Sequence, residues 1–150
     1  MPETMPETMP GTTLVTEAGF APEDWAEGRI LPFEQFWSGQ DLPADEVGVD
    51  FPNDRDPADL APWLDRLALI RIAFPAMGDG RGFSLASRLR AMGYRGRLRA
   101  AGPLIADQFP AARRVGFDEV EVPEAIARRQ PAADWRAPAR PSYRERLTQR

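Results

Sequence analysis

Short apolar runs and helix-spaced apolar positions alternate along the middle of the chain. Four short segments, each followed by proline or glycine, predict β-strands. Their first residues are spaced by 22, 28 and 21 positions, which leaves room for a helix between successive strands. The predicted strands are Val47–Phe51, Leu69–Phe74, Arg97–Ala101 and Asp118–Val122.

Before, between and after these runs, apolar residues recur every three or four positions, as in an amphipathic helix. Asp56-Pro57 has the favoured order of an N-cap acid followed by proline. Gly93 is well placed to end a helix, and Pro110 kinks or restarts the helix that contains it. The predicted helices are 33–37, 57–67, 84–92, 103–115 and 124–129.

Strands that alternate with helices of this length predict an α/β fold with about four βα units and a parallel sheet. Two architectures fit: an open sandwich, or half of a (β/α)₈ barrel. A half-barrel leaves edge strands that the N-terminal segment or a second subunit must cover. We predict an α/β domain over residues 47–129, preceded by an irregular, aromatic-rich lead-in over residues 14–46. The order of the strands stays open.

The two ends of the chain differ in charge. Residues 1–13 contain the acidic near-repeat MPETMPETMP, which has neither a basic region nor an apolar core; we expect it to be disordered rather than a signal peptide or membrane span. Residues 130–150 form an Arg- and Pro-rich tail, expected to be extended and partly ordered. From these ends of the chain we expect a soluble cytoplasmic protein that has no membrane partner.

Charge is divided unevenly between the two halves. Residues 1–65 carry a net charge of −13 and residues 66–150 a net charge of +9. Such a dipolar surface either matches itself, within the chain or in a homo-oligomer, or steers a charged partner. Nucleic acid is a weaker hypothesis, because the pI is about 5.0, no binding motif is present, and only Trp135 and Tyr143 in the tail could stack on bases.

The composition removes several kinds of chemistry. The chain has no Cys and no His, and all 19 basic residues are Arg. Thiolate-held iron–sulfur clusters, thiol exchange, His ligation of haem or metals, and Lys Schiff bases therefore cannot come from this chain. No flavin or nicotinamide fingerprint is present either, so we predict no metal and no cofactor.

The glycine-rich segment 76–84 is the most informative candidate site. Ligands of parallel α/β folds bind at the carboxyl ends of the strands, and this segment follows the second predicted strand. Gly78, Gly80 and Gly82 let the backbone approach an anion, Arg81 offers a bidentate donor, and Ser84 could cap the next helix. The alternative, given equal weight, is a structural crossover, because the order of residues is neither G-x-G-x-x-G nor a P-loop.

Asp107 and Gln108, which lie beyond the third strand, complete the candidate site. The ordinary interpretation is a solvated helix face; the sharper one is that Asp107 pairs with Arg81 and orders the loop. The candidate ligand-binding residues are Asp79, Gly80, Arg81, Gly82, Ser84, Asp107 and Gln108. No catalytic residue is assigned.

A set of short motifs runs through the stretch from Val49 to Val122. They are Phe74-Pro75, Asp79-Gly80-Arg81-Gly82 followed by an aromatic residue and Ser84, Leu89-Arg90, Tyr94-x-Gly96, Arg99-Ala100-x-Gly102, Asp107-Gln108 and Gly116-Phe117-Asp118. With these motifs the stretch resembles the proteobacterial family known as domain of unknown function 934.

The resemblance implies a genomic association rather than a mechanism. Members lie beside genes for assimilatory sulfite reductase and phosphoadenylyl-sulfate reductase, and are often labelled oxidoreductase on that basis alone. The leading hypothesis is an accessory protein of sulfate and sulfite reduction that acts with sulfite reductase or its electron donor. The alternative is an enzyme or sensor that binds a small anion or a nucleotide phosphate at Gly78–Ser84.

Overall fold

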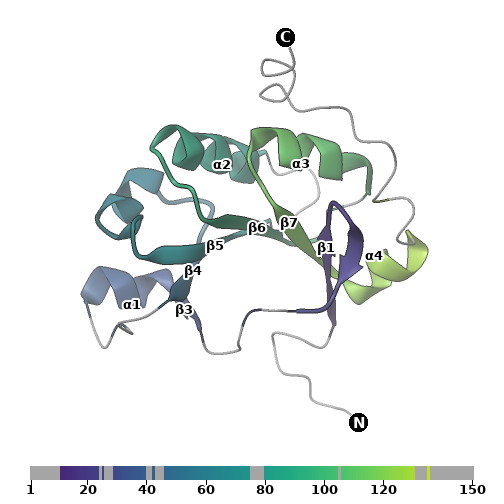
Figure 1. Cartoon of the computed structure of the whole chain (residues 1–150), viewed down its shortest axis with the longest axis horizontal. Helices are drawn as coiled ribbons and strands as arrows, with labels where there is room; N and C mark the ends of the chain where they lie inside the picture. The colour runs from purple at the N-terminus through teal and green to yellow at the C-terminus, as the bar shows by residue number, and fades with distance from the viewer. Residues whose placement is uncertain are drawn as a thin grey trace.

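The structure is a computed structural model, and its strands form one seven-stranded mixed sheet in the order β2-β1-β7-β6-β5-β4-β3 (Figure 1). The residues it describes are 11–23, 25, 29–39, 42, 46–74, 80–104, 106–130 and 135.

Five parallel strands follow one another across the sheet in chain order. They are β3 (Ile30–Pro32), β4 (Val47–Phe51), β5 (Leu67–Ala73), β6 (Arg97–Ala101) and β7 (Glu119–Pro123). The N-terminal strand β1 (Thr12–Thr16) pairs antiparallel with β7, and β2 (Gly19–Ala21) pairs antiparallel with β1. The predicted α/β fold is therefore confirmed, and the N-terminal segment covers the β7 edge of the parallel strands.

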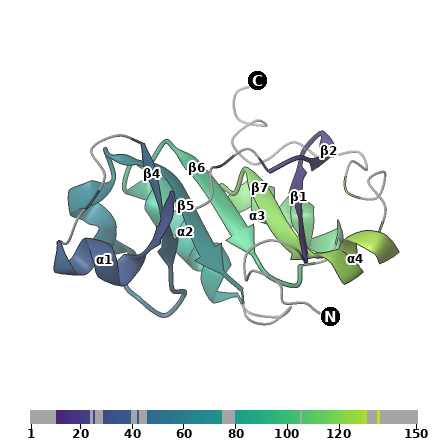
Figure 2. The same ribbon diagram turned by 90° about the horizontal axis from the view of Figure 1, so that it is seen from below.

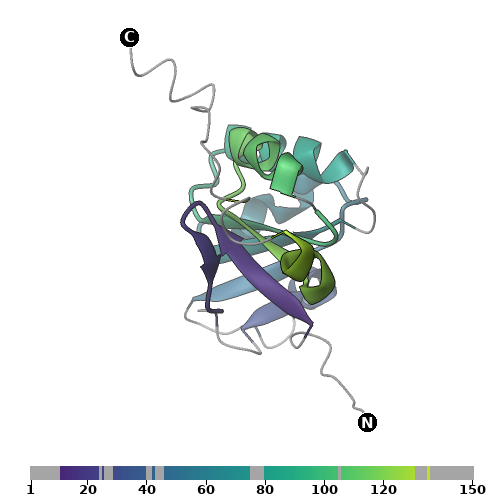
Figure 3. The ribbon, with the colours of Figure 1, turned by 90° about the vertical axis from the view of Figure 1, so that its right-hand side faces the viewer.

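The helices lie on one side of a curved sheet. They are α1 (Phe33–Ser38), the 3₁₀ helix η1 (Pro57–Trp63), α2 (Arg81–Ala91), the 3₁₀ turn η2 (Ala106–Gln108), α3 (Phe109–Val115) and α4 (Glu124–Arg129). Right-handed crossovers between strands in consecutive order put every connecting helix on the same face. Figures 1 and 3 show this face as the convex side. Of the two predicted architectures, the structure has the open half-barrel.

Alternate strand residues build a core between the convex face and the helices. Phe51, Ile72, Ala100 and Val120 are fully buried and lie side by side on β4 to β7. Leu85, Leu89 and Ala112 on α2 and α3, and Phe33 and Phe36 on α1, pack onto the same cluster. The other face of the sheet, the concave one, is called the open face below; Figure 2 shows it with the strands toward the viewer.

The lead-in was expected to be irregular, and this prediction is wrong for three segments. Strands β1, β2 and β3 lie within it or at its start, and Thr12 and Thr13 belong to β1 rather than to a disordered terminus. These strands have three to five residues each. Their apolar runs are too short to predict strands from the sequence. These strands are stabilised by pairing with the edges of a sheet whose other strands come later in the chain, and that pairing leaves no local pattern.

Helix limits differ from the prediction where proline intervenes. Asp56 is the expected N-cap, since its Oδ1 accepts a hydrogen bond from the Ala58 N–H at 2.9 Å. The helix after it is a 3₁₀ helix that contains Pro62 and ends at Trp63, so Leu67 begins β5 instead of ending a helix. Pro110 marks a restart, because η2 gives way to α3 at Phe109.

The charged ends lie mostly outside the described residues, which exclude 1–10, 131–134 and 136–150. Trp135 is an exception: its side chain is buried, its Nε1 donates to the Gln130 carbonyl at 2.8 Å, and its ring meets Phe109 edge-on. It packs on α3 and is therefore not available to stack on bases. No helix in the described part of the chain is long and apolar enough to cross a membrane.

Candidate functional site

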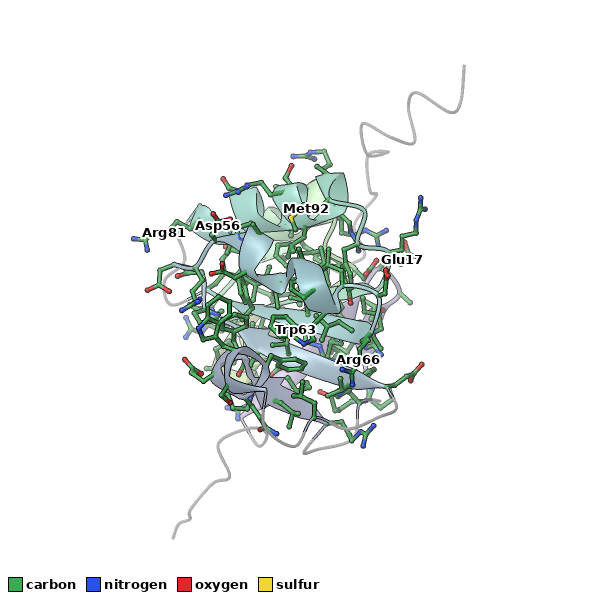
Figure 4. All side chains as sticks on the ribbon, turned by 90° about the vertical axis from the view of Figure 1, so that its left-hand side faces the viewer. Glu17, Asp56, Trp63, Arg66, Arg81 and Met92 are labelled. Atoms are coloured by element: carbon green, nitrogen blue, oxygen red, sulfur yellow. The ribbon has the colours of Figure 1, made fainter. Side chains whose placement is uncertain are left out.

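The predicted glycine-rich site lies at the carboxyl edge of the sheet, where α2 begins. Asp79 and Gly78 fall outside the described residues. Gly80 and Arg81 are exposed. Figure 4 shows the Arg81 side chain extending outward at the same edge as Asp56, while Glu17 and Arg66 lie at the opposite edge. Arg81 is thus accessible to a ligand or a partner approaching this edge.

The two described glycines of this segment have different roles. A Cβ at Gly82 would lie 2.2 Å from the Phe74 ring, so only glycine lets α2 pack against that ring. A Cβ at Gly80 would meet nothing within 4 Å, and its φ of −81° suits any residue. Gly82 is required by packing, whereas neither the backbone nor the packing requires glycine at Gly80.

Ser84 does not cap α2, which corrects the prediction. The helix begins three residues earlier, at Arg81, with Gly80 as its N-cap. The Ser84 N–H donates to the Gly80 carbonyl at 3.3 Å, and the Ser84 side chain is exposed. The glycine at position 82 explains the earlier start, because it lets the first turn lie directly on Phe74.

Asp107 and Gln108 belong to η2, beyond β6, which neighbours β5 in the sheet. Asp107 is exposed and Gln108 half-buried. No ion pair joins Asp107 to Arg81 among the described residues, so the proposed loop-ordering pair is wrong and Asp107 lies on a solvated face. The structure places the described candidates along one edge of the sheet without bringing Arg81 and Asp107 into contact.

Several motifs that carry the family resemblance meet at Arg90, at the other end of α2. The Arg90 guanidinium donates to the carbonyls of Gly116, Tyr94 and Gly96 and to Asp118, at 2.7–3.1 Å. The Tyr94 hydroxyl in turn donates to the Leu67 carbonyl at 3.1 Å, and burial raises its pKa. These residues fasten α2, α3, β6 and β7 together, so their role is structural.

A second polar region, which the sequence analysis missed, covers the open face. Its side chains alternate with core residues along four strands, and we call it the open-face charge network. It consists of Asp50 on β4, Arg71 on β5, Arg97 and Arg99 on β6, and Glu119 and Glu121 on β7, together with Glu23 from the connection between β2 and β3.

Arg99 is the centre of this network and is completely buried. Its Nε donates to Glu119 at 2.7 Å, its Nη1 to Glu121 at 3.1 Å and to Glu23 at 2.8 Å, and its Nη2 to Glu23 at 3.0 Å. Burial alone would lower the pKa of Arg99, but the hydrogen bonds and charges of Glu23 and Glu119 outweigh it, so the pKa is raised. Arg99 therefore stays charged.

Arg71 extends the network towards β4. Its guanidinium bonds Asp50 at 3.0 and 3.3 Å and Glu121 at 3.3 Å. Burial lowers the pKa of Arg71, and the bonds and charges of Asp50 and Glu121 raise it by more. Every guanidinium of the network thus has a carboxylate partner, as buried charge requires.

An alternation in the sequence marks this network. The strands read Arg97-Leu-Arg99 and Glu119-Val-Glu121, with charge at every second residue. In a parallel sheet such positions face the same side, and the sheet register pairs Arg99 with Glu119. A half-barrel exposes the face that a closed barrel would fill with apolar side chains, and polar residues occupy it here.

No group of three or more His, Cys, Asp or Glu suited to a metal ion occurs among the described residues.

The fold and these two polar regions define a small α/β protein of the half-barrel type. The chain belongs to the family described as bacterial protein of unknown function (DUF934), whose model matches residues 48–149. The match begins at Gly48, so the region from β4 onward carries it, whereas β1 to β3 precede it. No curated protein and no solved structure matches the chain significantly.

Proposed function

We propose that this protein is a cytoplasmic accessory protein of assimilatory sulfite reduction that docks to sulfite reductase or to its electron donor. The family resemblance supplies the pathway. The observation that supports docking is the division of charge between two parts of the surface, which steers association with a charged partner.

The acidic part is the segment from α1 to the start of β5. Its exposed carboxylates are Glu34, Glu46, Asp54, Asp56 and Asp65. The basic part is the helical layer from α2 to α4, whose exposed arginines are Arg81, Arg88, Arg95, Arg114, Arg128 and Arg129. The two parts meet where Arg88 on α2 pairs with Asp56 at 3.1 Å. The other arginines leave the surface of α2 to α4 positively charged, so an acidic partner surface would approach these helices rather than α1, η1 or the open face.

Reversing the charge of this layer tests the docking proposal. We expect Arg128→Glu/Arg129→Glu to slow association with the partner by about tenfold or more at low salt, because steering depends on the sign of the surface charge. The measurement is the association rate with purified sulfite reductase, or with its electron donor, as a function of salt concentration. The matched control is Asp54→Arg/Asp65→Arg, which changes the acidic part and should not slow association.

The pathway itself is tested in the cell. Deletion of the gene is expected to impair growth with sulfate as the sulfur source and to leave growth with cysteine intact. Normal growth of the deletion strain on sulfate, together with no binding to sulfite reductase or its electron donor at low salt, would contradict the proposal.

A second candidate function is small-anion binding at the carboxyl edge. It is favoured by Gly80, a glycine that the packing does not require, and by the exposed Arg81 beside it at the first turn of α2. Backbone N–H groups at a helix start attract anions, and a guanidinium adds a bidentate donor.

Titration calorimetry with sulfate, sulfite and a nucleotide tests this candidate. We expect Arg81→Ala to weaken binding about tenfold or more, since it removes a charged hydrogen-bond donor. Arg95→Ala, which removes an exposed arginine away from this edge, should bind as the wild type does. No heat of binding with wild-type protein for any of the three ligands would rule the candidate out.

A further inference from the structure

Glu23 occupies a cradle of three donors on the open face. Its carboxylate accepts from Arg99 Nη1 at 2.8 Å, from Arg99 Nη2 at 3.0 Å and from the backbone N–H of Trp25 at 3.0 Å. Two parallel N–H donors from one guanidinium form the fork by which arginine recognises the carboxylates and other oxyanions of ligands. The side chain of Glu23 thus binds where an oxyanion would.

The two sides of this contact differ in how firmly they are held. Arg99 has no exposed surface, and Glu119 and Glu121 fix its Nε and Nη1 from β7. The Glu23 side chain, in contrast, is 48% exposed and comes from the connection between β2 and β3 rather than from a strand. The guanidinium is therefore a preorganised part of the sheet, and the carboxylate is the side of the pair that solvent reaches.

A cavity lies next to Glu23. Its volume is about 290 Å³, and it is lined by Thr12, Thr13, Leu14, Ala21, Pro22 and Glu23 itself. This is close to the lower limit of the volumes of small-molecule sites. The Thr13 hydroxyl donates to the Glu124 carboxylate at 2.8 Å, so the cavity offers a ligand mainly the aliphatic surface of Leu14, Ala21 and Pro22. Such a lining suits the body of a small organic anion whose charged end enters the cradle.

Trp25 supplies an independent observation. Its indole Nε1–H is buried and has no hydrogen-bond acceptor among the described residues, and its ring lies 5.6 Å from the Arg97 guanidinium. A buried donor without an acceptor costs free energy, and an oxygen atom of a ligand would satisfy it. The connection between β2 and β3 therefore supplies both the Glu23 carboxylate and, two residues later, the unsatisfied Trp25 Nε1–H donor.

The charges of the network fit an exchange of one anion for another. Arg71, Arg97 and Arg99 are balanced by Asp50, Glu119 and Glu121, and Glu23 adds one negative charge to this neutral set. A ligand with one anionic group would restore the same balance when it replaces Glu23. The ligand would also replace the two hydrogen bonds, of four in all, that Arg99 makes to Glu23.

We propose that the open face carries an oxyanion-binding site, with the Arg99 fork and the Trp25 backbone N–H as its recognition groups and Glu23 as an internal competitor. The ligand is a small molecule with a carboxylate, sulfate or phosphate group, which displaces Glu23 and lies in the adjacent cavity. This site is separate from the carboxyl edge at Arg81, and it does not depend on the docking function proposed above.

Titration calorimetry of the full chain with acetate, succinate, sulfate and phosphate tests the site. Glu23→Ala and Glu23→Gln remove the competing charge, and each is expected to bind at least one of these anions about tenfold or more tightly than wild type, a change of roughly 1.4 kcal/mol. Tighter binding of acetate and succinate than of the inorganic ions would assign the site to carboxylates; the reverse order would assign it to sulfate or phosphate.

The matched control is Glu17→Ala. Glu17 is also a glutamate of the N-terminal segment, and it pairs with Arg113 at 2.8 Å, but its side chain is 73% exposed and that of Arg113 is 30% exposed. Its removal should leave anion affinity unchanged. Adding Arg81→Ala to Glu23→Gln should not reduce the gain, which distinguishes this site from the carboxyl edge.

Two results would overturn the proposal: affinities of both Glu23 variants that equal those of wild type for all four anions, or an equal gain in Glu17→Ala. Glu23→Gln keeps the shape of the side chain and one acceptor for Arg99. It therefore tests whether removing the charge increases anion affinity even if the alanine variant fails to fold.

Discussion

Replacement of Arg99 by methionine is expected to lower the free energy of unfolding by about 3–5 kcal/mol, the range found when one partner of a buried ion pair is removed. Arg99 is fully buried, and Glu119 and Glu121 are nearly so. Methionine fills much of the same volume but leaves these carboxylates without their central cation. Urea unfolding followed by circular dichroism measures the change.

Two further variants identify the cause. Arg114→Met removes an exposed arginine on α3 and should change stability by no more than about 0.5 kcal/mol. Adding Glu119→Gln to Arg99→Met should recover about 1 kcal/mol or more, because one uncompensated buried charge is gone. A loss below about 1 kcal/mol in the single variant would show that the open-face charge network does not stabilise the fold.

Four of the five parallel strands, β4 to β7, were predictable because each of their βα units is specified locally. An apolar run, a closing proline or glycine and a helix-spaced pattern recur from Val47 to Arg129, and consecutive units leave few topologies. The antiparallel hairpin β1–β2 was not predictable in this way. Leu14 and Val15 are its only buried apolar side chains on β1, and their pairing partners on β7 lie at the far end of the domain.

The candidate site was predicted in place but not in detail. The rule that ligands bind at the carboxyl ends of parallel strands located the Gly80–Ser84 segment, and the structure puts Arg81 at that edge. The rule does not distinguish a glycine needed for packing from one that is not, and only the neighbour, Phe74, shows that Gly82 is of the first kind.

The open-face charge network shows a different limit of sequence interpretation. Arg97, Arg99, Glu119 and Glu121 lie in segments that were correctly predicted to be strands. In the sequence their charge counts only towards the overall asymmetry, because local patterns do not show which strands are neighbours. Once β6 and β7 are adjacent, the same residues become a buried network. Glu23, from a connection outside the strands, could not have been assigned to it from the sequence.

Substitution of Gly102 by alanine is expected to cost about 3 kcal/mol or more in free energy of unfolding, combining a positive-φ penalty of about 1–2 kcal/mol with overpacking of about 1–3 kcal/mol. The φ of Gly102 is +153°, and a Cβ there would lie 2.0 Å from the Phe74 carbonyl oxygen. Phe74 cannot move away freely, because its N–H donates to the Ala101 carbonyl at 2.7 Å. Thermal and urea unfolding measure the loss.

Two other glycines separate the contributions to this cost. Gly93 has a φ of +102° and open space around its Cβ position, so Gly93→Ala should show the conformational penalty alone, about 1 kcal/mol. Gly80 has an ordinary φ of −81° and open space, so Gly80→Ala should leave stability unchanged or raise it by about 0.5 kcal/mol. If Gly102→Ala cost no more than Gly93→Ala, the close approach of β6 to Phe74 would not be what requires glycine at this position.

If Gly80→Ala retained full stability but lost binding of an anion or a partner, the glycine of the Gly80-Arg81 pair would serve the site rather than the fold.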